Sequence, residues 1–147
     1  MKISTLKAFG EEAVAQIESI NHSLVVAEVS QIVSDLKDIR YSQNFLLYIV
    51  IPDIYNSGSA DAIQKNHELE LLLLYKRDDS DSYASYIDYM DQTKDAIEAL
   101  ELYIINHRYN NAPCSMFAKL NEAQNQFSPI TGFSGCIGWS LNVTIPE

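Results

Sequence analysis

The segment GCIGWSLNVTIPE, residues 135–147, alternates between apolar and small or polar side chains. Its apolar members fall on every second position: Ile137, Trp139, Leu141, Val143 and Ile145. A period of two is typical of a β-strand that lays one face on a core and turns the other outward. The segment therefore predicts a strand whose inner face, with the only tryptophan of the chain, packs against helices.

Two further apolar runs have strand length. NFLLYIVIP, residues 44–52, is continuously apolar and is closed by Pro52. Such a run predicts a central strand that is buried on both faces. HELELLLLYK, residues 67–76, predicts a second strand. The stretch between them, residues 53–66, is rich in Ser, Gly, Asn and Asp and predicts an exposed loop.

Helical spacing of apolar residues predicts a helix over 3–20 and a longer one over 82–107. Residues 24–39 are ambiguous, because their valine-rich start also suits a short strand; we favour a helix. A less regular third strand is expected over 115–127, followed by a turn over 128–135. These elements predict an α+β fold in one domain, 1–147. We expect a two-layer sandwich: a mixed or antiparallel sheet of three to four strands, backed on one face by N-terminal helices and one long central helix.

The composition is acidic, with 20 acidic and 10 basic residues among 147 and a formal net charge of −10. Such a surface repels phosphates and anionic lipid, which argues against specific nucleic-acid or membrane binding. The N-terminal stretch acquires acidic residues where a signal sequence would be apolar, so we expect the protein to remain in the cytoplasm that made it. Cys114 and Cys136 are accordingly expected to be reduced, buried thiols.

Patterns that carry chemistry are weak. His22, His67 and His107 fall in three different expected elements, without metal-ligand spacing. The acidic stretch 78–91 lacks the glycine that a calcium loop needs. GFSGC resembles a nucleophile elbow in composition, but it has no predicted strand before it or helix after it. The sequence therefore predicts no catalytic residue, no metal site and no cofactor, and we expect the protein not to be an enzyme.

Aromatic residues are the candidates for a protein–protein interface. Tyr83, Tyr86 and Tyr89 drift round the start of the long helix, so at least one should be partly exposed. Tyr55, in the expected loop, and Trp139, in the last strand, complete the set of candidate interface residues. Packing at the edge of the core is the alternative for each of them.

The C-terminal FSPITGFSGCIGWSLNVTIPE resembles the ending of small virion proteins of tailed phages and prophages of Bacteroidetes. Those proteins close with a phenylalanine-containing strand, a turn, a G-W/C pair and an alternating strand that ends in proline. The residues that match are Phe127, Phe133, Gly138, Trp139 and Pro146. The resemblance departs at CIGWSL, which has no charged residue before the G-W pair, and at the second helix-like segment of the N-terminal half.

The family is similar to tail terminators and head–tail connectors. The resemblance therefore implies a structural protein of the virion tail or neck that is assembled in the host cytoplasm. It implies a homo-oligomeric ring, usually a hexamer, that contacts other virion proteins and lets DNA pass through an acidic lumen. A small acidic adaptor or inhibitor, binding one partner protein, is the alternative that we keep open.

Overall fold

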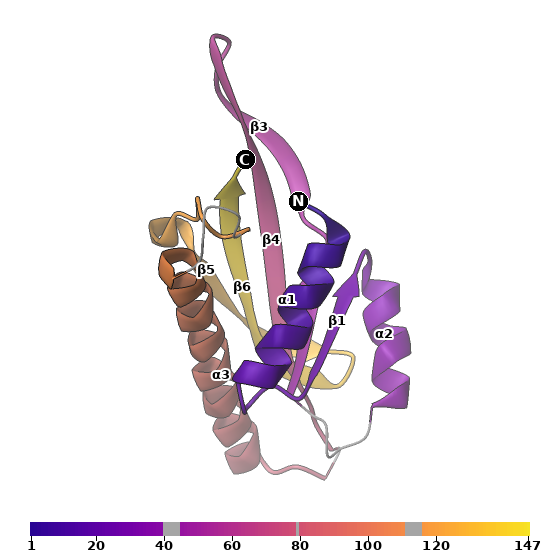
Figure 1. Cartoon of the computed structure of the whole chain (residues 1–147). Helices are drawn as coiled ribbons and strands as arrows, with labels where there is room; N and C mark the ends of the chain where they lie inside the picture. Colours follow the sequence, from indigo (N-terminus) through magenta and orange to yellow (C-terminus); the bar gives the residue numbers. More distant parts are fainter. Residues whose placement is uncertain (40–44, 79, 111–115) are drawn as a thin grey trace.

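The computed structural model describes residues 1–39, 45–78, 80–110 and 116–147 (Figure 1). Three α-helices and six strands occur in these ranges, with a short 3₁₀ turn at Glu122–Gln124. The helices are α1 (Ile3–Gln16), α2 (Val29–Asp38) and α3 (Tyr83–Asn110). The strands are β1 (His22–Val26), β2 (Phe45–Val50), β3 (Asp53–Ser59), β4 (Ala62–Lys76), β5 (Gln126–Phe133) and β6 (Cys136–Pro146). The α+β prediction is confirmed.

The sheet is mixed and has the order β1-β2-β4-β6-β5, with β3 also paired to β4. β1 runs parallel to β2, and the other pairs are antiparallel. The longest pairing joins β4 to β6 from Asn66↔Pro146 to Lys76↔Cys136, so the last strand lies inside the sheet, between β4 and β5. The expected count of three to four strands was too low, because residues 22–26 and 53–59 also form strands.

One face of the sheet is covered by α1 and α3. Leu6, Phe9 and Ala13 of α1 and Ile97, Leu100 and Ile104 of α3 lie in one buried cluster with alternate residues of β2, β4 and β6. Leu141, Val143 and Ile145 belong to this cluster, and Trp139 packs against it. The prediction that the alternating strand lays its apolar face on helices is confirmed.

The opposite face of β2 is covered by α2, which corrects the expectation of helices on one face alone. Ile32 and Leu36 of α2 form a second cluster with Leu46 and Tyr48 of β2, together with Val26, Leu74 and Cys136. Leu47 and Ile49, the alternate residues of β2, lie in the first cluster. Strand β2 is therefore buried on both faces, as its continuous apolar run predicted, and this burial requires a helix on each side.

Two polar contacts hold α2 against the sheet. The Asp35 carboxylate accepts hydrogen bonds at one oxygen from the Tyr48 hydroxyl and from His22 Nε2, both at 2.8 Å. The Lys76 ammonium donates to the Leu36 and Ile39 carbonyl oxygens at 2.6 and 3.1 Å, at the C-terminal end of α2 where positive charge is favoured. Burial and the bond to Asp35 raise the pKa of Tyr48 far above its ordinary value.

Local predictions at four stretches differ from the structure. Residues 53–66 were expected to form a loop, but they form β3, a turn and the start of β4. The ambiguous stretch over 24–39 divides into the end of β1 and α2, so both readings apply to part of it. The expected turn over 128–135 is mostly strand β5. Of the third strand expected over 115–127, residue 115 lies outside the described residues, and among the described residues 116–127 only 126–127 lie in a strand.

Cys136 is a free, fully buried cysteine, as predicted, and burial raises the pKa of its thiol to about 11. Cys114 lies outside the described residues. Within the described ranges, the helices are too short or too polar to cross a membrane.

Candidate interaction surface

A β-hairpin projects beyond the end of the sheet (Figure 1). We call it the arm and define it as β3, the turn at 60–61 and Ala62–Lys65 of β4. Pairing of β6 with β4 ends at Asn66, so β4 continues for four residues past its neighbour. At about 3.3 Å per residue, this continuation carries the tip roughly 13 Å beyond the sheet. Because the arm continues the central strand β4, the direction of β4 fixes the direction of the arm.

The turn chemistry of the tip explains why this polar stretch can form a hairpin. Gly58 has a φ of +98°, a left-handed conformation that glycine adopts without strain. A Cβ at this position would lie 2.1 Å from the Ala62 carbonyl oxygen. The Asn66 side-chain amide also donates to the Ser57 hydroxyl at 2.6 Å, which ties the two strands together near the base of the arm.

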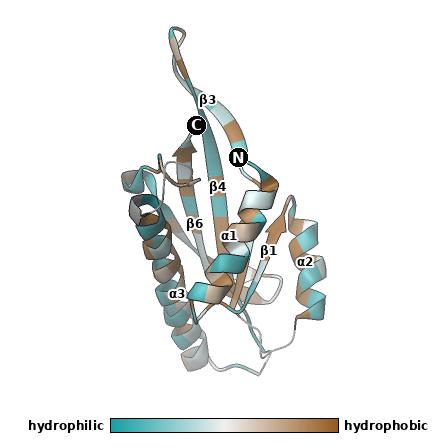
Figure 2. Cartoon of the chain, in the orientation of Figure 1, coloured by the Kyte–Doolittle hydropathy of each residue, from teal (hydrophilic) through white to brown (hydrophobic). Residues whose placement is uncertain are grey.

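The arm exposes two isoleucines on the same face. Ile54 is paired with His67, and Ile63 is paired with Gly58, so strand alternation places both isoleucines on the side of the sheet that α1 covers. They are 62% and 67% exposed. Figure 2 shows brown, hydrophobic segments within an otherwise pale or teal hairpin. Large aliphatic side chains on a projecting hairpin are typical of a contact surface.

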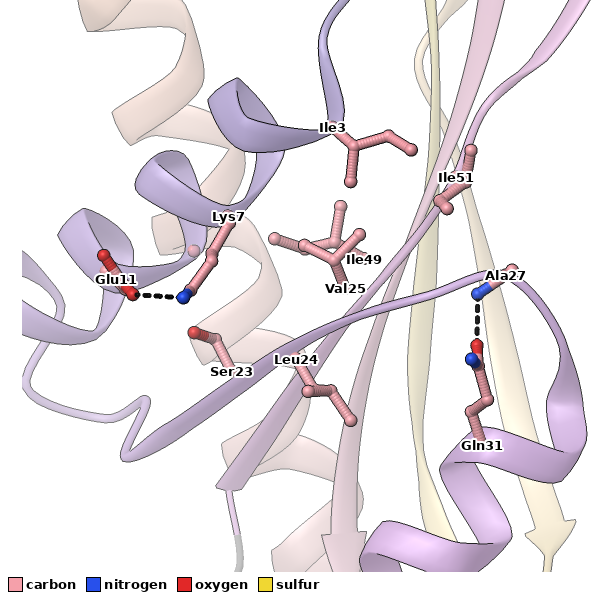
Figure 3. Close-up of a pocket in the computed structure, with 11 residues that line it drawn as sticks. Ile3, Lys7, Glu11, Ser23, Leu24, Val25, Ala27, Gln31, Ile49 and Ile51 are labelled. Atoms are coloured by element: carbon pink, nitrogen blue, oxygen red, sulfur yellow. Dashed lines mark hydrogen bonds and ion pairs between the residues drawn. The ribbon is translucent and has the colours of Figure 1, made fainter.

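A hollow of about 310 Å³ lies between α1, β1 and the end of β2 (Figure 3). Its walls are mainly aliphatic, with Ile3, Val25 and Ile49 pointing into it and Ile51 at one end. Lys7 and Glu11 of α1, whose charged groups are 3.8 Å apart, stand at its side. Ile3 is 56% exposed at its mouth. The hollow thus offers apolar surface to a side chain that approaches from outside.

The aromatic candidates do not form one surface, although Tyr83 and Tyr86 are neighbours. Tyr55 lies on the arm and is 42% exposed, while Tyr83 lies at the far end of α3 and is 79% exposed. Tyr83 stacks on Tyr86, which also lies under the Arg77 guanidinium at 5.0 Å. Tyr89 of α3 stacks on Tyr75 of β4, with their ring centroids 3.9 Å apart. Tyr55 and Tyr83 are therefore open to a partner, at opposite ends of the molecule.

Trp139 joins β6 to α3. Its indole Nε1 donates to the Met90 carbonyl oxygen at 3.1 Å, and its ring packs against the main core. The Trp139 side chain is therefore packed at the core, which was the alternative to a role in an interface.

Sequence reasoning missed Ile54 and Ile63, because the Ser, Gly, Asn and Asp around them dominate the composition. A signal was nevertheless present. Two β-branched residues, Ile54 and Ile63, flank a stretch rich in Ser, Gly and Asp, as expected for a hairpin of two short strands.

The three histidines lie apart, as their spacing predicted. His22 Nε2 is hydrogen-bonded to the Asp35 carboxylate, and His107 Nε2 lies 3.3 Å from Glu12 Oε1. Among the residues that the structure describes, no three His, Cys, Asp or Glu side chains gather in a way that could hold a metal ion.

His67 is a buried polar residue at the base of the arm. It is 4% exposed, and neither of its ring nitrogens has a hydrogen-bond partner among the described residues. A buried polar group without a partner costs about 1–3 kcal/mol. We therefore expect His67→Leu to raise the free energy of unfolding by about 1 kcal/mol in urea titrations at neutral pH.

His22→Leu is the matched control. The same substitution there removes a bond to Asp35, so it should lower the free energy of unfolding. If His67→Leu is as destabilising as His22→Leu, the His67 ring has a partner in solution and our account of it is wrong.

No family model matches this sequence, and a search of curated proteins also finds no match.

Proposed function

We propose that this chain is a structural assembly protein of a phage tail or neck, of the tail terminator or head–tail connector type. Copies of it form a closed ring, with a hexamer as the expected size, within the virion. The other virion proteins that adjoin the ring are its further partners. The proposal joins the resemblance of the C-terminal segment to the geometry of the arm.

The observation that carries the proposal is the arm with its two exposed isoleucines. Leaving large aliphatic side chains in water on a projecting hairpin brings no benefit to a chain that functions alone. In a ring, each copy needs one patch that fits a different patch on its neighbour. A protrusion supplies one half of such a heterologous contact.

The charge suits a ring that surrounds DNA. A net charge of −10 per copy gives the assembly a negative surface, which repels phosphates. DNA can then pass through the lumen without adhering to its wall.

Light scattering coupled to size-exclusion chromatography tests the proposal. One chain has a mass of 16.6 kDa, so a hexamer would have a mass of roughly 100 kDa. We expect a single species at an integer multiple of the chain mass, which becomes populated as the protein concentration rises. A monomer at every concentration tested would contradict the proposal.

A monomer would instead favour the alternative function, a small acidic adaptor or inhibitor. The arm supports this alternative as well, because a hairpin with exposed side chains can insert into one partner protein. The two functions differ in whether the chain associates with itself.

A further inference from the structure

We propose that the arm of each copy docks in the hollow of the next copy, with Ile63 entering between α1 and β1. This inference rests on the proposed function and specifies the contact that closes the ring. Its occupant is a second copy of this chain.

The first argument is that the arm and the hollow are both apolar and both open. Ile63 is 67% exposed on the arm, and Ile3 is 56% exposed at the mouth of the hollow. Val25 and Ile49 line the interior. Inserting one isoleucine into this space removes apolar surface from water on both sides of the contact, which is worth roughly 25 cal/mol per Å².

The second argument is that the two surfaces cannot meet within one molecule. β4 is a single strand from Ala62 to Lys76, paired with β6 up to Asn66. Bending the arm back to its own hollow would break this strand. The arm points away from the body (Figure 1), while the hollow is lined by residues of α1 and β1. A contact between arm and hollow therefore joins two copies, and it is heterologous, as a ring requires.

The third argument is charge. Asp61 lies at the exposed tip of the arm. Lys7 lines the hollow, with its ammonium 3.8 Å from the Glu11 carboxylate, and Lys2 is the N-cap of α1, where the helix dipole is also positive. When Ile63 docks, an acidic tip faces a basic helix end, and this complementarity orients the contact.

The two ends of the strand order β1-β2-β4-β6-β5 also differ. β5 carries Pro129 and a register shift between Ile130 and Phe133, both of which disfavour the approach of another strand. β1, at the other edge and beside the hollow, has the sequence HSLVV without proline. The side of the molecule that carries the hollow is therefore the one left open to a hairpin.

Disulfide cross-linking between two single-site variants tests the contact. Both variants carry Cys114→Ser, while Cys136 is retained because its thiol is fully buried. One variant has Ile63→Cys on the arm, and the other has Ile3→Cys at the hollow. After mixing and mild oxidation, we expect roughly tenfold more mixed dimer than with the matched control, Ile63→Cys mixed with Leu102→Cys. Leu102 is 59% exposed on α3, outside the hollow.

A second pair of variants measures association without cysteines. Ile63→Asp should weaken self-association about tenfold or more, because a carboxylate would have to enter an apolar hollow. Leu102→Asp places the same charge on another exposed position and should leave association unchanged.

The outcomes separate the two proposals. Equal cross-linking with Ile3→Cys and Leu102→Cys, or a preference for dimers between two arms, would overturn the docking contact even if rings form. A chain that stays monomeric by light scattering would overturn the proposed function, and the docking contact with it.

Discussion

Gly138→Ala is expected to lower the free energy of unfolding by about 3 kcal/mol or more. Gly138 lies in β6, where a Cβ would be 1.9 Å from the Leu73 carbonyl oxygen and 3.1 Å from the Leu74 Cα. These are backbone atoms of the neighbouring strand β4, so no side-chain rotation relieves the clash. The two strands would have to separate at the Leu74–Gly138 pair, near one end of the longest pairing of the sheet.

Urea unfolding followed by circular dichroism measures this change, and Gly132→Ala is the matched control. Gly132 lies in β5, and a Cβ there would meet no atom within 4 Å. The control should therefore remain within about 0.5 kcal/mol of the wild type. A Gly138→Ala protein as stable as its control would show that β6 does not pass β4 as closely as the structure has it. The glycine of the G-W pair thus has a packing role, independent of any resemblance.

Asp35→Ala is expected to lower the free energy of unfolding by about 2–3 kcal/mol. The substitution leaves the fully buried Tyr48 hydroxyl and the partly buried His22 ring without their acceptor. It also removes one of the two polar contacts between α2 and the sheet; the Lys76 bonds to the end of α2 remain. Chemical denaturation of the variant gives the value directly.

Asp38→Ala is the control for Asp35→Ala. Asp38 is exposed at the end of the same helix, where loss of a negative charge is neutral or slightly favourable. Combining Asp35→Ala with Tyr48→Phe should cost less than the sum of the single changes, since the second removes the group that the first leaves unpaired. Additive effects would mean that the Asp35–Tyr48 bond contributes nothing to stability.

Much of the fold could be predicted from local patterns. The alternation of apolar and polar residues predicted β6, and the continuous apolar run predicted β2. The helical spacing of apolar residues predicted α1 and α3. Each pattern reports how one segment is buried, which is a local property of the sequence. The double burial of β2 requires cover on both faces, but the expected arrangement placed the helices on one face alone, so α2 on the second face was missed.

The arm could not be predicted in this way, because it has no buried face. Its strands form because Gly58 permits the turn and because β4 continues outward from the sheet, and composition alone indicated a loop. The register that puts Ile54 and Ile63 on one face depends on pairing between β3 and β4. The hollow, likewise, is formed by α1, β1 and β2 together, so the pattern of any one of these segments cannot predict it.

The central claim is that copies of this chain associate through the arm. A shortened variant isolates it: residues 57–64 are replaced by Asn-Gly, a two-residue turn that suits the paired Asn56 and Lys65. The sheet below Lys65 is retained, and far-ultraviolet circular dichroism with thermal unfolding checks that the variant folds.

Sedimentation velocity of the wild-type and shortened proteins, over the same range of concentrations, tests the claim most directly. We predict that the wild type sediments as a closed oligomer at high concentration, while the folded, shortened variant sediments as a monomer throughout. Equal oligomers from both proteins would show that the arm is not the contact, and monomers from both would contradict self-assembly itself.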